Sequence, residues 1–125
     1  MRKNLVISQM ALALSLILGA APAVANDVAS GEKVFKRCKA CHYADKEKNK
    51  TGPHLVNVID RKAGSIGGYK YSKAMATSGL VWDEATLTAY LKAPKKFLKG
   101  TKMAFAGLKK DADIKNLIAY LKTQK

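Results

Sequence analysis

Long apolar runs are scarce in this 125-residue chain, and the one that stands out lies near the N-terminus. Met10–Leu18 is apolar apart from one serine, with the basic pair Arg2-Lys3 before it and Ala23-Val24-Ala25 after it. This order is typical of a secretory signal peptide over residues 1–25, cleaved at the small residues. The alternative is an uncleaved membrane anchor, which the polar residues inside the run disfavour. We therefore predict an exported, periplasmic domain over residues 26–125.

Acidic residues are also scarce, since nine Asp and Glu face 23 Lys and Arg, for a net charge of +14. Removal of residues 1–25 leaves 100 residues, enough for one domain, with a net charge of +12. Outside the cytoplasm, nucleic acid is a poor partner for such a charge. An acidic protein or an anionic membrane surface fits better. A simpler alternative is that the lysines mainly keep the domain soluble.

Only two cysteines occur, and both lie in the motif Cys38-Lys39-Ala40-Cys41-His42. Cys-x-x-Cys-His is the attachment site of a c-type haem. Two thiols at this spacing can add to the two vinyl groups of one haem edge, and the histidine that follows can bind the iron. The alternative is a redox dithiol, as in thioredoxin-like folds, but no alternating strand-and-helix pattern surrounds the pair. A haem protein would then have no disulfide, and the covalent cofactor would stabilise the small domain.

The domain has no internal repeat, and its apolar residues recur at helical steps of three and four. We predict an all-α fold of about four helices and long loops. Helices are expected over residues 27–39, 72–77 and 83–92, followed by a last one that begins at Asp111. Asp27 or Ser30, Asp83 and Asp111 are the candidate caps, and Pro94 ends the third helix. Residues 94–108 are predicted to form a loop, and so long a loop in a small domain usually has a function.

His42 would occupy one axial side of the haem iron, so the other side decides the chemistry. The carbonyl of Pro53 is our candidate acceptor for the His42 Nδ1–H, which would leave Nε2 for the metal. After signal removal only Met75 and Met103 could supply a thioether on the opposite side. Met103 is favoured, because it lies in the long loop whereas Met75 lies in a predicted helix, where methionine is more often core filler. His54 is expected to be a surface or loop histidine.

The ordered set of motifs resembles class I cytochrome c, of the soluble bacterial type close to mitochondrial cytochrome c and cytochrome c2. The resemblance covers Asn26–Lys125. It rests on Cys38-Lys39-Ala40-Cys41-His42, Thr51-Gly52-Pro53-His54-Leu55, Arg61-Lys62-Ala63-Gly64, Tyr69-Lys70-Tyr71, Gly79-Leu80-Val81-Trp82, Leu87 to Lys96, Gly100 to Gly107 and Leu117 to Leu121. The chain departs from the family at Asn57 and Asp60, where relatives commonly have glycine, and at Met75, where mitochondrial relatives often have asparagine.

The resemblance implies a small cytochrome c fold wrapped around one covalent haem c. Its thioether bonds would come from Cys38 and Cys41, and its axial ligands would be His42 and Met103. The residues implied around the haem are Pro53, Arg61, Tyr71, Trp82 and Tyr90, with the Tyr90 hydroxyl on the Met103 sulfur. The first helix would pack on the last one through Gly31 and Phe35.

We predict an exported one-electron carrier, not an enzyme, that shuttles between respiratory or photosynthetic partners. The alternative is a small c-type haem enzyme or gas sensor with an open distal site. The expected partners are acidic-surfaced redox proteins such as an oxidase, a dehydrogenase, a reaction centre or a peroxidase. We expect a monomer with no nucleic-acid partner and at most weak peripheral membrane contact. The positions that match the family's docking ring are Arg37, Lys50, Lys95, Lys96, Lys102, Lys109 and Lys110.

Overall fold

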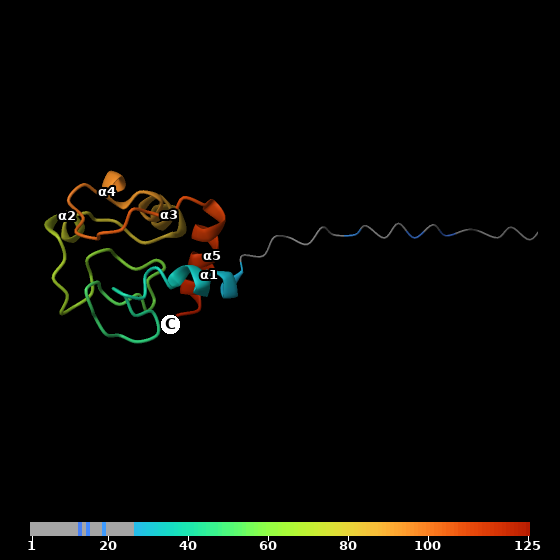
Figure 1. Ribbon diagram of the computed structural model, residues 1–125, viewed down its shortest axis with the longest axis horizontal. Coiled ribbons are helices and arrows are strands. Elements are labelled where there is room, and N and C mark those ends of the chain that lie inside the picture. The colour runs from blue at the N-terminus through green and yellow to red at the C-terminus, as the bar shows by residue number, and fades with distance from the viewer. Residues whose placement is uncertain (1–12, 14, 16–18, 20–26) are drawn as a thin grey trace, which may run out of the picture.

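The computed structural model describes residues 13, 15, 19 and 27–125, so the predicted signal peptide lies almost wholly outside the described residues. Five helices joined by long loops make up the described domain (Figure 1). They are α1 (Val28–Phe35), α2 (Lys73–Ala76), α3 (Glu84–Lys92), α4 (Pro94–Phe97) and α5 (Asp111–Lys122). The predicted all-α fold is confirmed, with one helix more than expected.

Helix α1 begins and ends for local reasons. The Asp27 carboxylate caps it and accepts a hydrogen bond from the Ala29 amide at 2.9 Å. The helix ends at Phe35 rather than at the predicted residue 39. From there the chain continues in tighter turns, in which the Cys38 amide donates to the Phe35 carbonyl three residues earlier, at 2.8 Å. The cysteine motif therefore lies in turns that follow α1 directly.

Two predictions around the long loop need correction. Pro94 ends α3 as expected, but it also begins the short helix α4, so the prediction of a loop over residues 94–108 is wrong for its first turn. Proline suits a first helical position because its missing N–H is not needed there. Asp111 is the first residue of α5 and not its cap, since Lys110 holds the cap position. The Asp111 carboxylate instead accepts from Lys92 Nζ at 3.0 Å.

Helices α1 and α5 cross closely because Gly31 has no side chain. A Cβ at Gly31 would lie 1.9 Å from the Asn116 carbonyl oxygen, so only glycine fits at this crossing. One turn further, the rings of Phe35 and Tyr120 pack with their centroids 5.4 Å apart. Figure 1 shows the two helices against each other at one end of the domain. This is the packing that the family resemblance implied.

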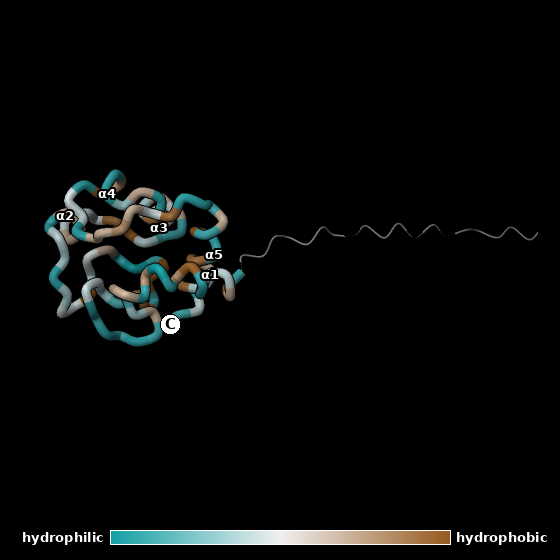
Figure 2. The backbone as a smooth tube through the Cα atoms, in the orientation of Figure 1, coloured by the Kyte–Doolittle hydropathy of each residue, from teal (hydrophilic) through white to brown (hydrophobic). Residues whose placement is uncertain are grey.

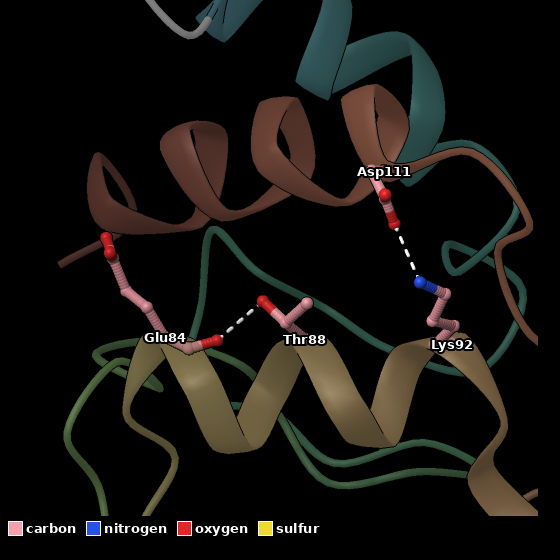
Figure 3. A network of polar contacts seen from close by, with 4 residues as sticks. All are labelled: Glu84, Thr88, Lys92 and Asp111. Carbon is pink, nitrogen blue, oxygen red and sulfur yellow. Dashed lines mark hydrogen bonds and ion pairs between the residues drawn. The ribbon is translucent and has the colours of Figure 1, made fainter.

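Helices α3 and α5 run in opposite directions and are joined by ion pairs at both ends, of which Figure 3 draws the pair of Lys92 and Asp111. At one end Lys92 pairs with Asp111, and at the other Glu84 pairs with Lys122. The four side chains are about half exposed or more, so each pair adds little to stability. The burial of apolar residues holds these helices together instead. Figure 2 shows apolar segments at α3 and where α1 meets α5.

The core contains Leu108, Ile114 and Leu117, which are fully buried.

The loop between α1 and α2 contains two residues with unusual backbone conformations. Asn57 and Asp60 have positive φ values of 54° and 64°. They are the positions at which the family commonly has glycine. Asn and Asp tolerate this left-handed conformation better than other side chains do. The loop therefore adopts, at these two positions, a backbone conformation that glycine usually occupies.

None of the helices among the described residues is long and apolar enough to span a membrane.

Candidate haem-binding site

The turns after α1 present both cysteines and the histidine in succession. The Cys41 and His42 amides both donate to the Cys38 carbonyl, at 3.1 and 2.9 Å. Cys38 is half-buried and Cys41 is exposed, and both are free thiols. Burial raises the pKa of Cys38 to about 11. Reactive redox cysteines usually have a lowered pKa, so this environment disfavours the redox-dithiol alternative.

The His42 ring is fixed by the segment that contains Pro53. Its Nδ1 lies 2.7 Å from the Pro53 carbonyl oxygen, the contact predicted from the sequence. Burial lowers the pKa of His42, although the Pro53 carbonyl opposes this effect. The lowered pKa favours the neutral ring, with Nδ1–H donating to the Pro53 carbonyl and Nε2 free for a metal.

Gly52 is a further determinant of the His42 position that the sequence analysis missed. Its amide donates to the Cys41 carbonyl at 2.8 Å, which joins the two segments. A Cβ at Gly52 would lie 2.3 Å from His42 Cε1, so the imidazole lies directly against the glycine backbone. The only signal in the sequence was the Gly-Pro pair itself, which marks a turn and not a contact with a histidine.

One cavity of about 430 Å³ brings the predicted site residues together. This volume is within the usual range for a cofactor pocket. Its wall includes Cys38, Cys41, His42, Pro53, Arg61, Tyr71, Trp82, Tyr90 and Met103. The remaining wall is mostly apolar, with Phe35, Leu55, Val58, Leu87, Leu91, Leu117 and Leu121 among its residues. Met75 lines the same cavity, so both candidate thioethers face one space.

The loop with Met103 is attached to the domain on both sides of the methionine. On one side the hydroxyls of Tyr90 and Thr101 are hydrogen-bonded at 2.8 Å. On the other side the Leu108 amide donates to the Leu91 carbonyl at 2.8 Å. The family resemblance had implied the Met103 sulfur as the partner of Tyr90, whereas the structure pairs this hydroxyl with Thr101.

Comparisons with known proteins agree with this geometry. The family described as Cytochrome c matches residues 28–125. The chain belongs to this family.

Two relatives and one solved structure show how close the similarity is. Cytochrome c2 iso-2 of Magnetospirillum fulvum is 52% identical over 95 residues, which cover 76% of this chain and 99% of the relative. Cytochrome c2 of Rhodomicrobium vannielii is 49% identical over 111 residues, covering 88% and 89%. The structure of cytochrome cH from Methylobacterium extorquens is 49% identical, covers 78% of this chain and 98% of that one, and superposes with a TM-score of 0.74. The chain is thus a class I cytochrome c of the c2 type, with covalently attached haem c and a role in electron transport.

The hydrogen bonding of Arg61 shows whether the cavity suits a haem, because a haem carries two carboxylates that need cationic or hydrogen-bond donors. Its Nη1 donates to the Val56 carbonyl and its Nη2 to the His54 carbonyl, both at 3.0 Å. Its Nε is buried at the cavity without a partner among the described residues. Burial lowers the pKa of this guanidinium, so a neighbouring anion would stabilise its charge. An unpaired cationic donor in an apolar cavity beside two thiols and a neutral imidazole fits a haem.

His54 lies in a loop, as the sequence predicted, but it is not on the surface. Only 8% of the residue is exposed, and its Nδ1 accepts a hydrogen bond from the Val56 amide at 3.3 Å. Its own amide donates to Asn49 Oδ1 at 3.0 Å. His54 is thus a buried residue that supports the loop beside Arg61, and no surface histidine. Sequence reasoning missed this because the contacts depend on the folded path of the loop.

The basic residues predicted for docking are all exposed, but they are not equally free. Lys50 Nζ donates to the Lys39 carbonyl at 2.9 Å, and Lys109 Nζ to the Ala106 carbonyl at 3.4 Å. Lys102 Nζ donates to the Lys70 carbonyl and lies 4.5 Å from the centre of the Tyr69 ring. Arg37 and Lys102 also line the cavity. Lys95, Lys96 and Lys110 have no side-chain hydrogen bond or ion pair within residues 27–125.

Proposed function

We propose that this chain is an exported one-electron carrier whose haem is bound through thioether bonds to Cys38 and Cys41, with His42 and Met103 as axial ligands. One observation carries the proposal: both thiols, the oriented imidazole and the Met103 side chain line the same cavity. Met103 is favoured over Met75 because it lies in a loop, whereas Met75 lies in α2, where methionine is more often core filler. When bound, the haem iron supplies a one-electron couple between Fe(III) and Fe(II).

The surrounding residues favour electron transfer over chemical turnover. The Pro53 carbonyl holds the His42 ring in one orientation and one tautomer. The apolar wall limits the access of water, and Arg61 would neutralise a haem carboxylate. Two permanent protein ligands require little rearrangement and leave no open site for a substrate. The proposed role is therefore that of a carrier and not of an enzyme.

The visible spectrum of the purified holoprotein tests the two axial ligands. For the carrier, the reduced protein should not bind carbon monoxide readily at neutral pH. Ready binding would support the alternative, a small haem enzyme or gas sensor with an open distal site. Met103→Ala should abolish the absorption band that marks a thioether bound to ferric iron and should lower the potential. Met75→Leu is the matched control and should keep the band. Loss of the band in Met75→Leu alone would exchange the two assignments.

We also propose that residues 1–25 are a cleaved signal peptide and that the carrier works in the periplasm. The mass of the exported holoprotein tests this, because cleavage after Ala25 leaves a chain that begins at Asn26. A full-length chain in the membrane fraction would mean that the segment is retained as an anchor.

We further propose that the lysine-rich side of the molecule binds acidic redox proteins, such as an oxidase or a reaction centre. A patch of one charge speeds encounter with a partner of the opposite charge, and salt screens this attraction beyond about 8 Å at physiological ionic strength. The electron-transfer rate should therefore fall steeply with salt. Lys95→Glu together with Lys96→Glu should reduce the rate at low salt and leave the spectrum unchanged.

The control for this experiment must avoid lysines with structural contacts. Lys122 is unsuitable, since its partner Glu84 would face a second carboxylate after charge reversal. Lys62 and Lys125 are exposed, lie outside the predicted docking set and have no side-chain hydrogen bond or ion pair within residues 27–125. Their double reversal to Glu changes the net charge equally. If both double variants slowed transfer to the same degree, net charge alone would govern the rate and no localised docking face would exist.

A further inference from the structure

Helix α4 presents an aromatic ring to solvent. Phe97 is 40% exposed and is the only aromatic among the large apolar side chains that are exposed in the described part of the chain. The ring is nonetheless held in place, because it packs edge-on against the Tyr90 ring with the centroids 6.3 Å apart. At the start of the same helix Pro94 is fully buried and anchors α4 to the domain. Phe97 is therefore a supported ring on the surface.

The stretch of chain on either side of Phe97 carries only positive charge. Residues 85–110 contain no acidic residue and seven lysines. Of these, Lys92 has an ion pair with Asp111, whereas Lys95, Lys96 and Lys99 have none within residues 27–125. The two lysines of α4 immediately precede Phe97, and Lys99 follows it two residues later. Binding surfaces are enriched in aromatic residues and have a polar rim, and Phe97 with its neighbouring lysines has this arrangement.

We propose that Phe97 is the apolar anchor of the docking face and inserts into an apolar depression surrounded by carboxylates on an acidic redox protein. This inference rests on the proposed function and adds to it a residue that acts on contact. Lysines attract the partner from a distance and mainly raise the association rate. They do not define one orientation, because charge attraction varies little with small rotations. A buried ring does define one, since its contribution depends on close packing.

The position of the anchor relative to the cavity suits electron transfer. Phe97 packs on Tyr90, and Tyr90 lines the cavity that suits the haem. A partner seated on Phe97 is thus separated from the cavity wall by one aromatic residue. The short helix α4 offers a single ring and not an amphipathic face, so a protein depression is a better match than a lipid surface.

Phe97→Ser and Phe97→Leu test the anchor, and Val28→Ser is the matched control. Val28 is 41% exposed and lies on α1, far from α4 (Figure 1). Each reduced holoprotein is oxidised by washed membranes from the organism that encodes the chain and, separately, by ferricyanide, over a range of salt concentrations. Ferricyanide is a small anion that responds to the lysine charges and offers no depression for a ring. Chemical unfolding and the visible spectrum establish that each variant is folded.

Phe97→Ser should slow oxidation by membranes roughly five- to thirtyfold, the usual effect of truncating an interface anchor. The reduction should be similar at low and high salt, because an apolar contact is not screened. Oxidation by ferricyanide should stay at the parent rate. Phe97→Leu should retain most of the membrane rate because it keeps apolar area, and Val28→Ser should retain all of it.

Three results would overturn the inference. The first is a parent-like membrane rate for Phe97→Ser while Lys95→Glu with Lys96→Glu still slows transfer, which would leave the proposed carrier function intact. The second is an equal loss in the ferricyanide reaction, which would place the effect in the haem environment. The third is sedimentation of the parent with phosphatidylglycerol vesicles that Phe97→Ser abolishes without altering the membrane rate. That result would make the ring a lipid contact.

Discussion

Gly52→Ala tests how the His42 ring is held. An ideal Cβ at Gly52 would lie 2.3 Å from His42 Cε1, 2.7 Å from Nδ1 and 2.8 Å from Nε2. Favourable carbon contacts are about 3.5–4.0 Å, so the ring or the backbone would have to move by about 1 Å. Gly52 is not among the glycines with positive φ. Its replacement therefore adds a steric overlap and no unfavourable backbone conformation.

The expected cost follows from what prevents the ring from moving. Its Nδ1 lies 2.7 Å from the Pro53 carbonyl oxygen, and a displacement of this size would break that hydrogen bond. Overpacking costs about 1–3 kcal/mol, and a lost hydrogen bond adds about 0.5–1.5 kcal/mol. The free energy of unfolding of the holoprotein should fall by roughly 2–4 kcal/mol. Guanidinium unfolding followed by circular dichroism measures this change.

Gly67→Ala is the control. No heavy atom lies within 4 Å of a Cβ at Gly67, and its φ is not positive. The substitution should change stability by less than about 1 kcal/mol, in the stabilising direction, because alanine restricts the unfolded chain. If Gly52→Ala proved as stable as Gly67→Ala, the close packing of the imidazole on the Gly52 backbone would be refuted.

Three further results are expected. Gly31→Ala should destabilise the protein at least as much as Gly52→Ala, because the new Cβ would lie 1.9 Å from the backbone carbonyl oxygen of Asn116. An unfolding midpoint equal to that of the parent would contradict the close helix crossing. Burial lowers the pKa of His54 below its ordinary value of about 6.5. As the pH drops below 6.5, the unfolded chain therefore binds a proton at His54 before the folded chain does, and the free energy of unfolding should fall. His54→Asn should be less sensitive between pH 7.5 and 5 in the same unfolding assay, and an identical pH dependence would exclude His54 as the cause. Lys102→Gln should lower the free energy of unfolding by up to about 1 kcal/mol, because it removes the ammonium group that lies over the Tyr69 ring, and Lys102→Arg should restore part of this loss. Faster amide hydrogen exchange in residues 100–106 of Lys102→Gln is the direct measure. Exchange at the parent rate would show that Lys102 does not hold the loop.

Local features of this protein followed from the sequence because neighbours along the chain determine them. Asp83 caps α3 as predicted, with its carboxylate on the Thr86 amide at 2.7 Å. The apolar stripe of the last helix, from Ile114 to Leu121, is buried as its spacing requires. The five-residue cysteine motif indicated a c-type haem by spacing alone. The end of α1 and the cap of α5 were predicted less well, since residues at helix ends can satisfy the backbone in more than one way.

The tertiary structure decided which distant residues meet. The contacts of the Gly52 backbone with the His42 ring and of the Tyr90 hydroxyl with Thr101 join segments about ten residues apart that no periodicity connects. The same holds for Lys102. The sequence places it in one group with the other docking lysines, but in the fold its Nζ donates to the Lys70 carbonyl. Spacing specifies which face of a helix is apolar, whereas the path of the loops determines which donor, ring or charge that face encounters. The sequence by itself thus determined the cofactor and four of the five described helices, and the packing of the loops alone decided how the histidine is held and which charges remain free.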